Sequence, residues 1–346
     1  MITLKKQEVI GFVHSLSSMI DAGITLPDSL KAIEIKESNV NLKKAINQTR
    51  ADLEEGFTLS QSFKKLRPSI SEFIINMVYA GEQGAGLSSV LSRVVTHLEK
   101  EIELKKKIKG LYTYPIIVLS LCAGIILFLL LAVMPTFEVV YEQIGVELPL
   151  PTRFLLSSSD IMRTFWWAII GGMGLGFLGL KFSKKKRILI QGLRLVMLKV
   201  KVLRELFYLV MLAKFVRTFS DMLICNVPVI KSLRIVEKVI NDDEISGYAA
   251  DVIEQIKAGE SISHAFSKNS FFPPIMIQMT DVGEKSGNLG EVLDRYAIGM
   301  EKDIDIMTKK AVMVIEPLFS ILLAFIVGFI ALSIYLPMFD MMKATH

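Results

Sequence analysis

The chain has 346 residues, of which 51% are hydrophobic and 22% are charged. Soluble domains average about 45–50% apolar residues even when glycine is counted, so this apolar share predicts membrane spans, while the ordinary charged share predicts soluble domains between them. The net charge of +5 is explained by lysines beside membrane spans rather than by a nucleic-acid surface, because no stacking aromatic residues accompany the lysines.

Residues 1–110 are predicted to form a cytoplasmic domain of six helices. In the first helix, one apolar face recurs at spacings of three and four residues: Phe12, Leu16, Met19 and Ile20. Gly23 ends this helix, and Pro27 suits the first turn of the next. The pattern then predicts helices over residues 41–54, 59–65, 70–80 and about 87–109. The last of these has no helix breaker before Pro115, so we expect it to continue directly into the membrane.

Three apolar runs are predicted to be transmembrane helices, at residues 111–137, 164–181 and 313–339. The candidate boundary residues of the first and third runs are Pro115, Pro135, Glu316, Pro317 and Pro337. We interpret Glu316 as an interfacial acid at a helix start rather than as a functional charge within a span. In the middle run, Gly172 and Gly176 have the GxxxG spacing of a helix-packing face, although chance is an alternative in so glycine-rich a stretch.

The distribution of lysine and arginine sets the predicted orientation, because these residues favour the cytoplasmic side. Lysines precede the first and third runs and follow the second, whereas acidic residues dominate the connector at 138–163. We therefore expect cytoplasmic domains at 1–110 and 182–312, and an extracytoplasmic connector at 138–163 and tail at 340–346. The N-terminus is therefore expected inside and the C-terminus outside.

The sequence contains a tandem repeat. FVHSLSSMIDAGITLPDSL from Phe12 resembles FVRTFSDMLICNVPVIKSL from Phe215, an offset of 203 residues. GEQGAGLSSVL from Gly81 resembles GEKSGNLGEVL from Gly283, an offset of 202, so one small deletion preserves the register. We therefore predict an all-α membrane protein with two tandem six-helix cytoplasmic bundles and three transmembrane helices.

Glu82 and Glu284 occupy the same place in the two repeats. They are expected either to bind amides of the following helix or to serve as a partner contact, an interdomain contact or a cation ligand. The segment Gly283–Gly287 resembles a phosphate loop only superficially, since no strand precedes it and an acid precedes its lysine. Its glycines more simply provide positive φ angles at a helix–loop–helix corner.

No catalytic, cofactor-binding or metal-binding constellation is predicted from the sequence. The two cysteines, Cys122 and Cys225, have no CxxC spacing. The four histidines are far apart in sequence, and His14 falls on the polar side of its helix. The motifs GxSxG and HExxH do not occur.

Taken in order along the chain, the motifs resemble those of the GspF/PilC family of inner-membrane platform proteins in type II secretion and type IV pilus systems. The resemblance rests on both repeat segments quoted above and on GFTLSQSF, GESISHAF, VMPTFEVVYEQIGVELPLPTR and EPLFSILLAFIVGFIALSIYLPMFDMM. In the second repeat, Cys225-Asn226 stands where family members commonly have a glycine, but asparagine tolerates the left-handed conformation.

The resemblance implies a non-enzymatic platform that couples a hexameric assembly ATPase to the assembly of a pilin or pseudopilin fibre. The implied partners are the ATPase, pilins or pseudopilins, other inner-membrane assembly proteins, membrane lipid and further copies of the chain, with no cofactor and no nucleic acid. The alternative is a small-molecule membrane transporter or a membrane-bound enzyme. Uncharged spans argue against an ion or proton path.

Overall fold

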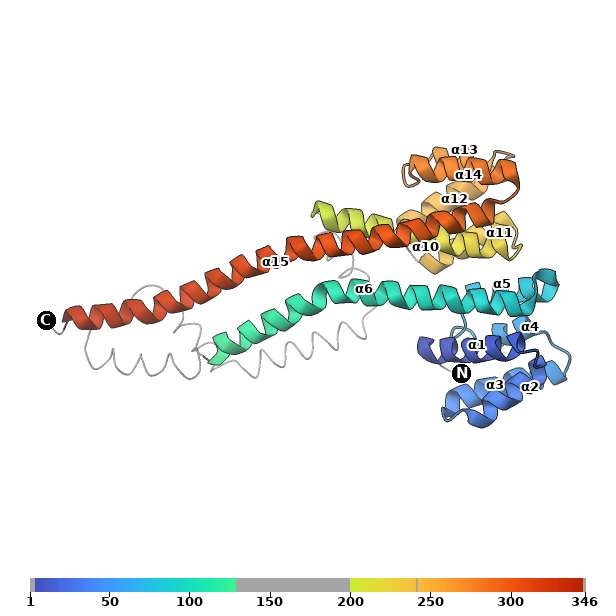
Figure 1. Ribbon diagram of the computed structural model, residues 1–346, viewed down its shortest axis with the longest axis horizontal. Helices are drawn as coiled ribbons and strands as arrows, with labels where there is room; N and C mark the ends of the chain where they lie inside the picture. Colours follow the sequence, from blue (N-terminus) through green and yellow to red (C-terminus); the bar gives the residue numbers. More distant parts are fainter. Residues whose placement is uncertain (1–3, 129–199, 241, 345–346) are drawn as a thin grey trace. The chain divides into compact units, whose positions relative to one another are not determined.

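The computed structural model describes residues 4–128, 200–240 and 242–344, and every regular element in these ranges is helical (Figure 1). The all-α class is therefore confirmed for this part of the chain. The chain divides into two compact units: unit 1 contains Met1–Lys106 and Phe207–Ile306, and unit 2 contains Lys107–Leu206 and Met307–His346. Gly172, Gly176 and Pro135 lie outside the described residues.

The first repeat begins with five α-helices and a π-helical turn. These are α1 (Lys6–Asp21), α2 (Leu26–Lys36), α3 (Val40–Glu54), α4 (Leu59–Lys65), α5 (Glu72–Ala80) and η1 (Gly81–Ala85), followed by α6 (Leu87–Phe128). Side-chain oxygens of Thr25, Asn39, Thr58 and Ser71 cap the starts of α2 to α5, because each accepts a hydrogen bond from an otherwise unpaired backbone amide. Helix α4 has the bounds that the sequence predicted, residues 59–65.

The second repeat has its helices in the same order. They are α10 (Lys201–Ile224), α11 (Val229–Ile240), α12 (Asp243–Lys257), α13 (Ile262–Ser267), α14 (Pro274–Ser286) and α15 (Leu289–Ala344). The starts of α11, α12 and α13 follow those of α2, α3 and α4 by 203 residues, and the starts of α14 and α15 follow those of α5 and α6 by 202. Asn226 has a φ of 59° at the corner where Gly23 has 82°, so asparagine does adopt the left-handed conformation there.

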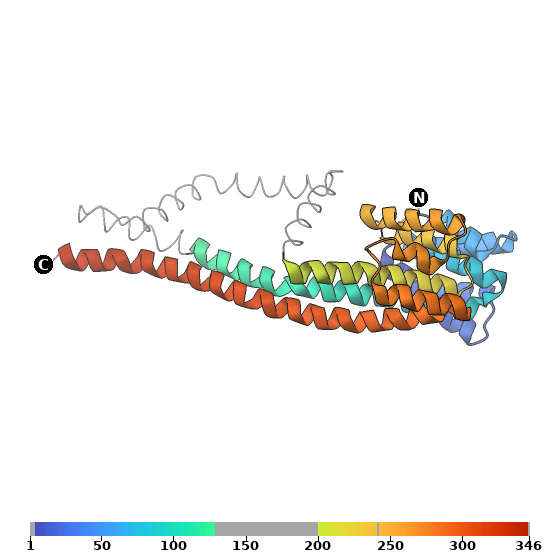
Figure 2. The ribbon, with the colours of Figure 1, turned by 90° about the horizontal axis from the view of Figure 1, so that it is seen from above.

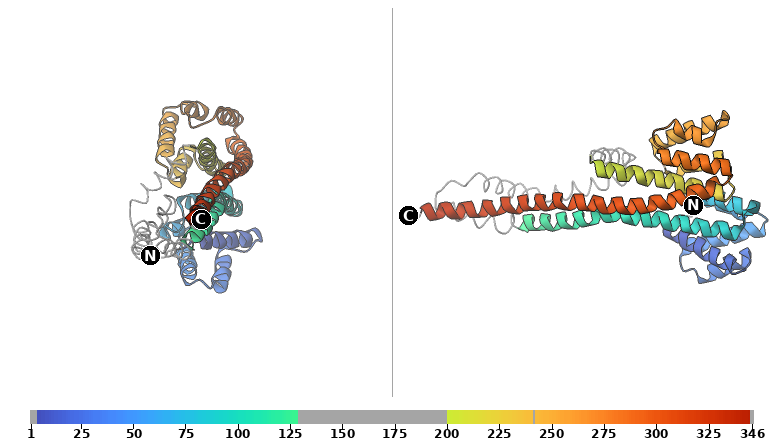
Figure 3. Two further views of the ribbon diagram at one scale, coloured as in Figure 1. Left: turned by 90° about the vertical axis from the view of Figure 1, so that its left-hand side faces the viewer. Right: turned by 45° about the horizontal axis from the view of Figure 1, so that its top comes forward.

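Unit 1 has an apolar core in each repeat. The core of the first repeat also includes four residues of the second: Met222, Cys225, Val227 and Ile235. The second repeat adds an aromatic cluster with ring centroids 4.3–6.2 Å apart, formed by Phe215, Phe219, Phe266, Phe271 and Phe272. Within unit 1, α1 to α4 and α12 to α14 lie on opposite sides of the adjacent starts of α6 and α15 (Figure 3).

Among the described residues, one helical stretch, Leu289–Phe329, is long and apolar enough to cross a membrane, and Ile116–Phe128 is a shorter apolar stretch. One expectation was wrong: Glu316 is not at a helix start, because α15 begins at Leu289 and continues through Pro317 and Pro337. Pro115 lies inside α6 in the same way. That these residues mark the membrane boundaries stays a prediction. A proline removes only one backbone donor, and helices in membranes tolerate that loss. The predicted continuity of the helix that begins at Leu87 is confirmed up to Phe128.

Candidate functional site

Within unit 1, α6, α10 and α15 lie side by side and bring charged side chains together (Figure 2). The charged residues are Arg93, His97 and Lys100 of α6, Arg217 and Asp221 of α10, and Asp294 and Glu301 of α15. On each helix these residues are three, four or seven positions apart, a spacing that places them on one face. Helical periodicity therefore builds the site, and its residues come from both repeats.

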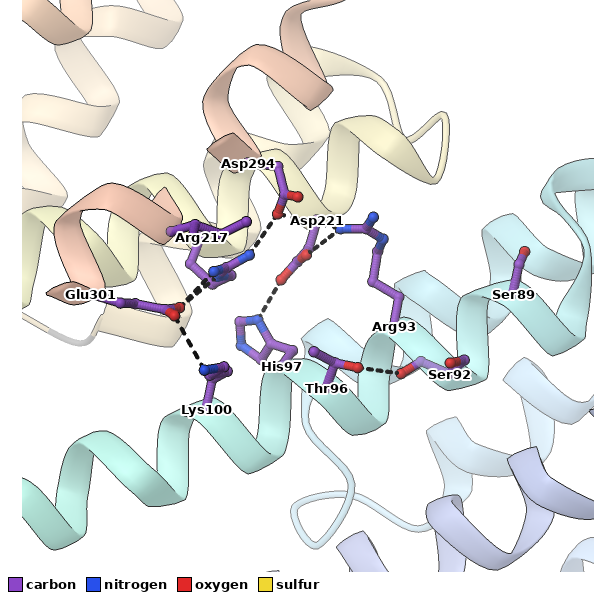
Figure 4. Close-up of a pocket in the computed structure, with 11 residues that line it drawn as sticks. Ser89, Ser92, Arg93, Thr96, His97, Lys100, Arg217, Asp221, Asp294 and Glu301 are labelled. Atoms are coloured by element: carbon purple, nitrogen blue, oxygen red, sulfur yellow. Dashed lines mark hydrogen bonds and ion pairs between the residues drawn. The ribbon is translucent and has the colours of Figure 1, made fainter. Parts of the chain in front are cut away.

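Asp221 lies at the centre of this ion-pair cluster (Figure 4). Its Oδ1 accepts a hydrogen bond from Arg93 Nη1 at 2.9 Å, and its Oδ2 lies 2.7 Å from His97 Nδ1. The Asp221 side chain is only 3% exposed. The His97 ring also stacks on Phe73, with 4.0 Å between the ring centroids. One carboxylate of the second repeat thus binds two side chains of the first.

Arg217 forms the other half of the ion-pair cluster. Its Nη1 lies 2.5 Å from Asp294 Oδ1, and its Nη2 lies 2.5 Å from Glu301 Oε1. Glu301 also reaches Lys100 at 3.3 Å, so α15 is connected to α6 as well as to α10. This contact and the 3.6 Å approach of Arg93 to Asp294 complete a network in which every carboxylate has a cationic partner.

Apart from His97, the ion-pair cluster has three basic side chains, those of Arg93, Lys100 and Arg217, and three carboxylates. Burial alone would lower the pKa of Arg93, but its hydrogen bond to Asp221 and the charges of Asp221 and Asp294 together raise that pKa above its usual value. A cavity of about 600 Å³ adjoins the cluster and is also lined by hydroxyl groups of α6 and by Ile298. No group of acidic, histidine or cysteine side chains suited to a metal ion occurs in the described parts of the chain.

A balanced, internally paired network of this kind holds helices together rather than supplying a free base or nucleophile. Removing one partner would leave a buried charge without compensation, which destabilises strongly. The arrangement therefore fixes the register of α6 against α10 and α15. Sequence analysis did not identify it, although the helical spacing of Arg93, His97 and Lys100 was a usable signal.

A second contact joins the repeats through α5 and α11. Lys238 Nζ lies 3.6 Å from Glu72 Oε1, and Lys231 Nζ lies 4.6 Å from the centroid of the Tyr79 ring. The ion pair lies at the rim, because the Lys238 and Glu72 side chains are 61% and 29% exposed. The shared apolar core beneath them is the more stabilising part of this contact, since exposed ion pairs contribute little.

Glu82 and Glu284 each bind the start of an earlier helix, not the following one. Ser60 donates its backbone N–H to Glu82 Oε1 at 3.1 Å and its hydroxyl to Oε2 at 2.5 Å. Ile262 and Ser263 donate their backbone N–H groups to Glu284 at 2.7 and 3.0 Å. The expected contact with the following helix was therefore wrong, and the observed one offsets the unpaired amides and positive dipole end of α4 and α13.

The remaining candidates have structural explanations. Gly283 lies where an added Cβ would come within 2.8 Å of Leu289 Cα, so glycine permits the close approach of α14 and α15. Gly287 ends α14 with a φ of 70°, which agrees with the predicted glycine corner. His14 is exposed, as expected. That Glu82 or Glu284 also contacts a partner stays a prediction.

Comparison with known proteins gives consistent matches over the two repeats. The model of the family "Type II secretion system (T2SS), protein F" matches residues 12–135 and again residues 215–337. The type IV pilus assembly protein PilC of Pseudomonas aeruginosa is 29% identical over 98% of this chain and 91% of its own length. PilC of Thermus thermophilus is 30% identical over 95% of this chain and 81% of its own length. The type II secretion system protein F of Aeromonas hydrophila is 28% identical over 96% of this chain and 86% of its own length. Since the family model covers most of the chain, the protein belongs to the type II secretion system protein F family.

Proposed function

We propose that this chain is a platform protein of the bacterial inner membrane that serves type IV pilus assembly or type II secretion. It would couple a hexameric cytoplasmic ATPase to the assembly of a pilin or pseudopilin fibre. The names of its relatives favour these two kinds of machine over other membrane functions. The proposed role is mechanical, with no cofactor and no reaction catalysed by the chain itself.

The observation that carries this proposal is the construction of α6 and α15. Each helix starts in unit 1, takes part in the ion-pair cluster, and continues without a break into an apolar stretch. Because an α-helix is held by its own backbone hydrogen bonds, a continuous helix transmits movement better than a flexible linker. A displacement applied to unit 1 would therefore reach the apolar stretches of both helices.

The proposed topology has three spans, with the N-terminus inside and the C-terminus outside. The two repeats form two cytoplasmic helical domains, at residues 1–110 and 182–312, that arose as copies of one unit. The constant offset of the helix starts and the two matches of one family model support this duplication. Further proposed partners are other inner-membrane assembly proteins, membrane lipid and additional copies of the chain.

The proposal is tested with the full chain in lipid nanodiscs and a purified assembly ATPase from the same organism. We expect the two to co-elute, and we expect ATPase activity only when the ATPase is present. A strain lacking the gene should lose its pili or its secreted proteins and recover them when the chain is supplied. Solute flux or ATP hydrolysis by the chain alone, without ATPase binding, would instead favour the transporter or membrane-enzyme alternative.

A further inference from the structure

The contact between the repeats inside one chain covers one face of the first repeat. Helix α5 contacts α11 through Glu72 and Tyr79, which lie against Lys238 and Lys231. Phe73 and Ala80, each one position further along α5, are only 2% and 9% exposed. From the second repeat, Val227 at the start of the α11 corner is 5% exposed. The first repeat thus offers a receiving face on α5, and the second repeat offers an inserting corner between α10 and α11.

The receiving face has a counterpart on the second repeat that nothing in the described chain covers. With the offset of 202 residues, Phe73 corresponds to Ile275 and Ala80 corresponds to Val282, both on α14. Ile275 is 47% exposed and Val282 is 51% exposed. Both positions carry apolar side chains, and the described chain leaves about half of each side chain exposed.

The inserting corner has an open counterpart on the first repeat. With the offset of 203 residues, Val227 corresponds to Ile24 and Lys238 corresponds to Ile35. Ile24 is 41% exposed and Ile35 is 74% exposed. Within the chain, Lys238 pairs with Glu72. The residues equivalent to this pair are Ile35 and Pro274. An ion pair within the chain is thus replaced by two apolar residues on the two open faces.

We propose that these faces bind each other between two copies of the chain. The corner around Ile24 and Ile35 of one copy docks on the α14 face around Ile275 and Val282 of the next. The arrangement would repeat the one that α10 and α11 adopt on α5 within a chain. Because α2 and α14 lie on opposite sides of unit 1, a single copy cannot bring its own two faces together (Figures 1 and 3).

The occupant is a second copy because the existing contact within the chain already shows that equivalent surfaces fit. The contact is head-to-tail, so its repetition gives a ring where the rotation closes. Its edge differs from that of the internal contact: Asp28 and Asp281 replace Lys231 and Tyr79. Asp281 is already paired with Lys285 at 2.7 Å, which reduces its repulsion of Asp28.

The inference rests on the self-association included in the proposed function, and cysteine cross-linking tests it separately. Two full-length variants, Ile35→Cys and Ile275→Cys, are made in a background with Cys122→Ser and Cys225→Ala, and are reconstituted together in lipid vesicles. A short bismaleimide should then link them into dimers. Each variant alone should give at least tenfold less dimer, because a head-to-tail contact does not bring identical positions together.

The matched control replaces Ile35→Cys with Val40→Cys, an exposed position of the first repeat outside the corner, at 65% exposure. This control should give no dimer above background with Ile275→Cys. Dimers from either single variant would overturn the head-to-tail contact, and so would no dimers from the mixture. If vesicles show no cross-link while the variants still restore pili or secretion in the deletion strain, the interface is wrong and the platform role stands.

Discussion

At the residue scale, Asp221 shows how the ion-pair cluster joins the two repeats. Both of its oxygens contact side chains of the first repeat, and the carboxylate is almost fully buried. A buried carboxylate is tolerated only when its hydrogen bonds and opposite charges offset its lost hydration. The equivalent position in the first repeat is Ser18, whose hydroxyl donates a hydrogen bond to the backbone oxygen of His14 in the same helix. The two repeats therefore contribute different chemistry to their junction.

Replacing Asp221→Asn should destabilise the full chain by about 3 kcal/mol, because Arg93 loses the charge that compensates its burial and His97 loses its carboxylate partner. Chemical unfolding in detergent, followed by circular dichroism, measures this change. The control, Asp281→Asn, breaks an exposed pair with Lys285 and should cost about 0.5 kcal/mol or less. Equal effects of the two substitutions would show that the cluster adds no more than a surface ion pair.

Asp52 is a second buried carboxylate, and it belongs to the first repeat alone. It accepts hydrogen bonds from Gln48 at 3.0 Å, Ser62 at 2.8 Å and Lys65 at 2.7 Å. Burial raises its pKa, but these hydrogen bonds and the charge of Lys65 outweigh burial and lower the pKa below its usual value. The second repeat has Gln255 at this position, and the Oε1 of Gln255 accepts no hydrogen bond from the described residues.

The lowered pKa of Asp52 predicts a specific pH dependence. A group whose pKa is lower in the folded state stabilises the fold at pH values above its pKa in the unfolded chain. This contribution is lost as the pH falls through the pKa of the folded state. The difference in unfolding free energy between the natural chain and Asp52→Asn should be constant from about pH 8 to pH 5 and should shrink below about pH 4. Asp251→Asn, an exposed control on α12, should change neither the size nor the shape of the curve. A difference that grows on acidification would contradict the assigned sign.

At the element scale, the Glu82 and Glu284 corners use a side chain to hold the start of a short helix. Helix α4 has seven residues and α13 has six, so neither is stable by itself. Each is also capped locally, by Thr58 or Ser261. The glutamate contacts come from 22 residues further along the chain and connect the short helix to the next part of the fold.

Replacing Glu284→Gln should loosen α13 while leaving the rest of unit 1 intact. The amide keeps one acceptor oxygen but turns an NH2 group toward a backbone donor, and we expect a loss of about 1 kcal/mol, as for other helix caps. Hydrogen exchange of the full chain, read by mass spectrometry on peptides covering α13, should accelerate roughly fivefold if exchange proceeds through local opening. Glu254→Gln, an exposed control on α12, should leave the exchange of α13 unchanged. Unaltered exchange in Glu284→Gln would make the corner dispensable for folding and leave partner binding as the role to test.

The sequence was sufficient for features that depend on local chemistry. Capping residues, glycine corners and apolar periodicity placed the helix at 59–65 and the start of α6 at Leu87 correctly. It was not sufficient for the ion-pair cluster, because His97 and Asp221 are 124 residues apart and each resembles an ordinary surface residue in its own helix. It also misjudged Glu316, since a charged residue beside a proline resembles a helix start when the helix in fact continues.

At the scale of the whole molecule, the duplication of the repeat constrains how the chain can be oriented in a membrane. Each repeat ends in a long helix that becomes apolar, so two repeats in direct succession would place their soluble parts on opposite sides of a membrane. The proposed additional span at residues 164–181 would restore both to the same side. This reasoning, together with the lysine distribution, gives the three-span topology proposed above.

The topology can be tested by labelling single cysteines from either side of the membrane. Cys225 is replaced by alanine, as at the equivalent Ala22; burial raises the pKa of its thiol to about 11, so the natural thiol would react slowly in any case. With Cys122→Ser as well, Glu147→Cys and Lys185→Cys are introduced singly. An impermeant maleimide added to intact spheroplasts should label the cysteine at position 147, because acidic residues dominate its connector. It should label the cysteine at position 185 only after the membrane is opened, because lysines and an arginine surround that site. Each variant must restore pili or secretion, which shows that the labelled protein is correctly inserted. Labelling of both positions from the same side would contradict the proposed middle span. It would also contradict the proposal that both repeats face the cytoplasm.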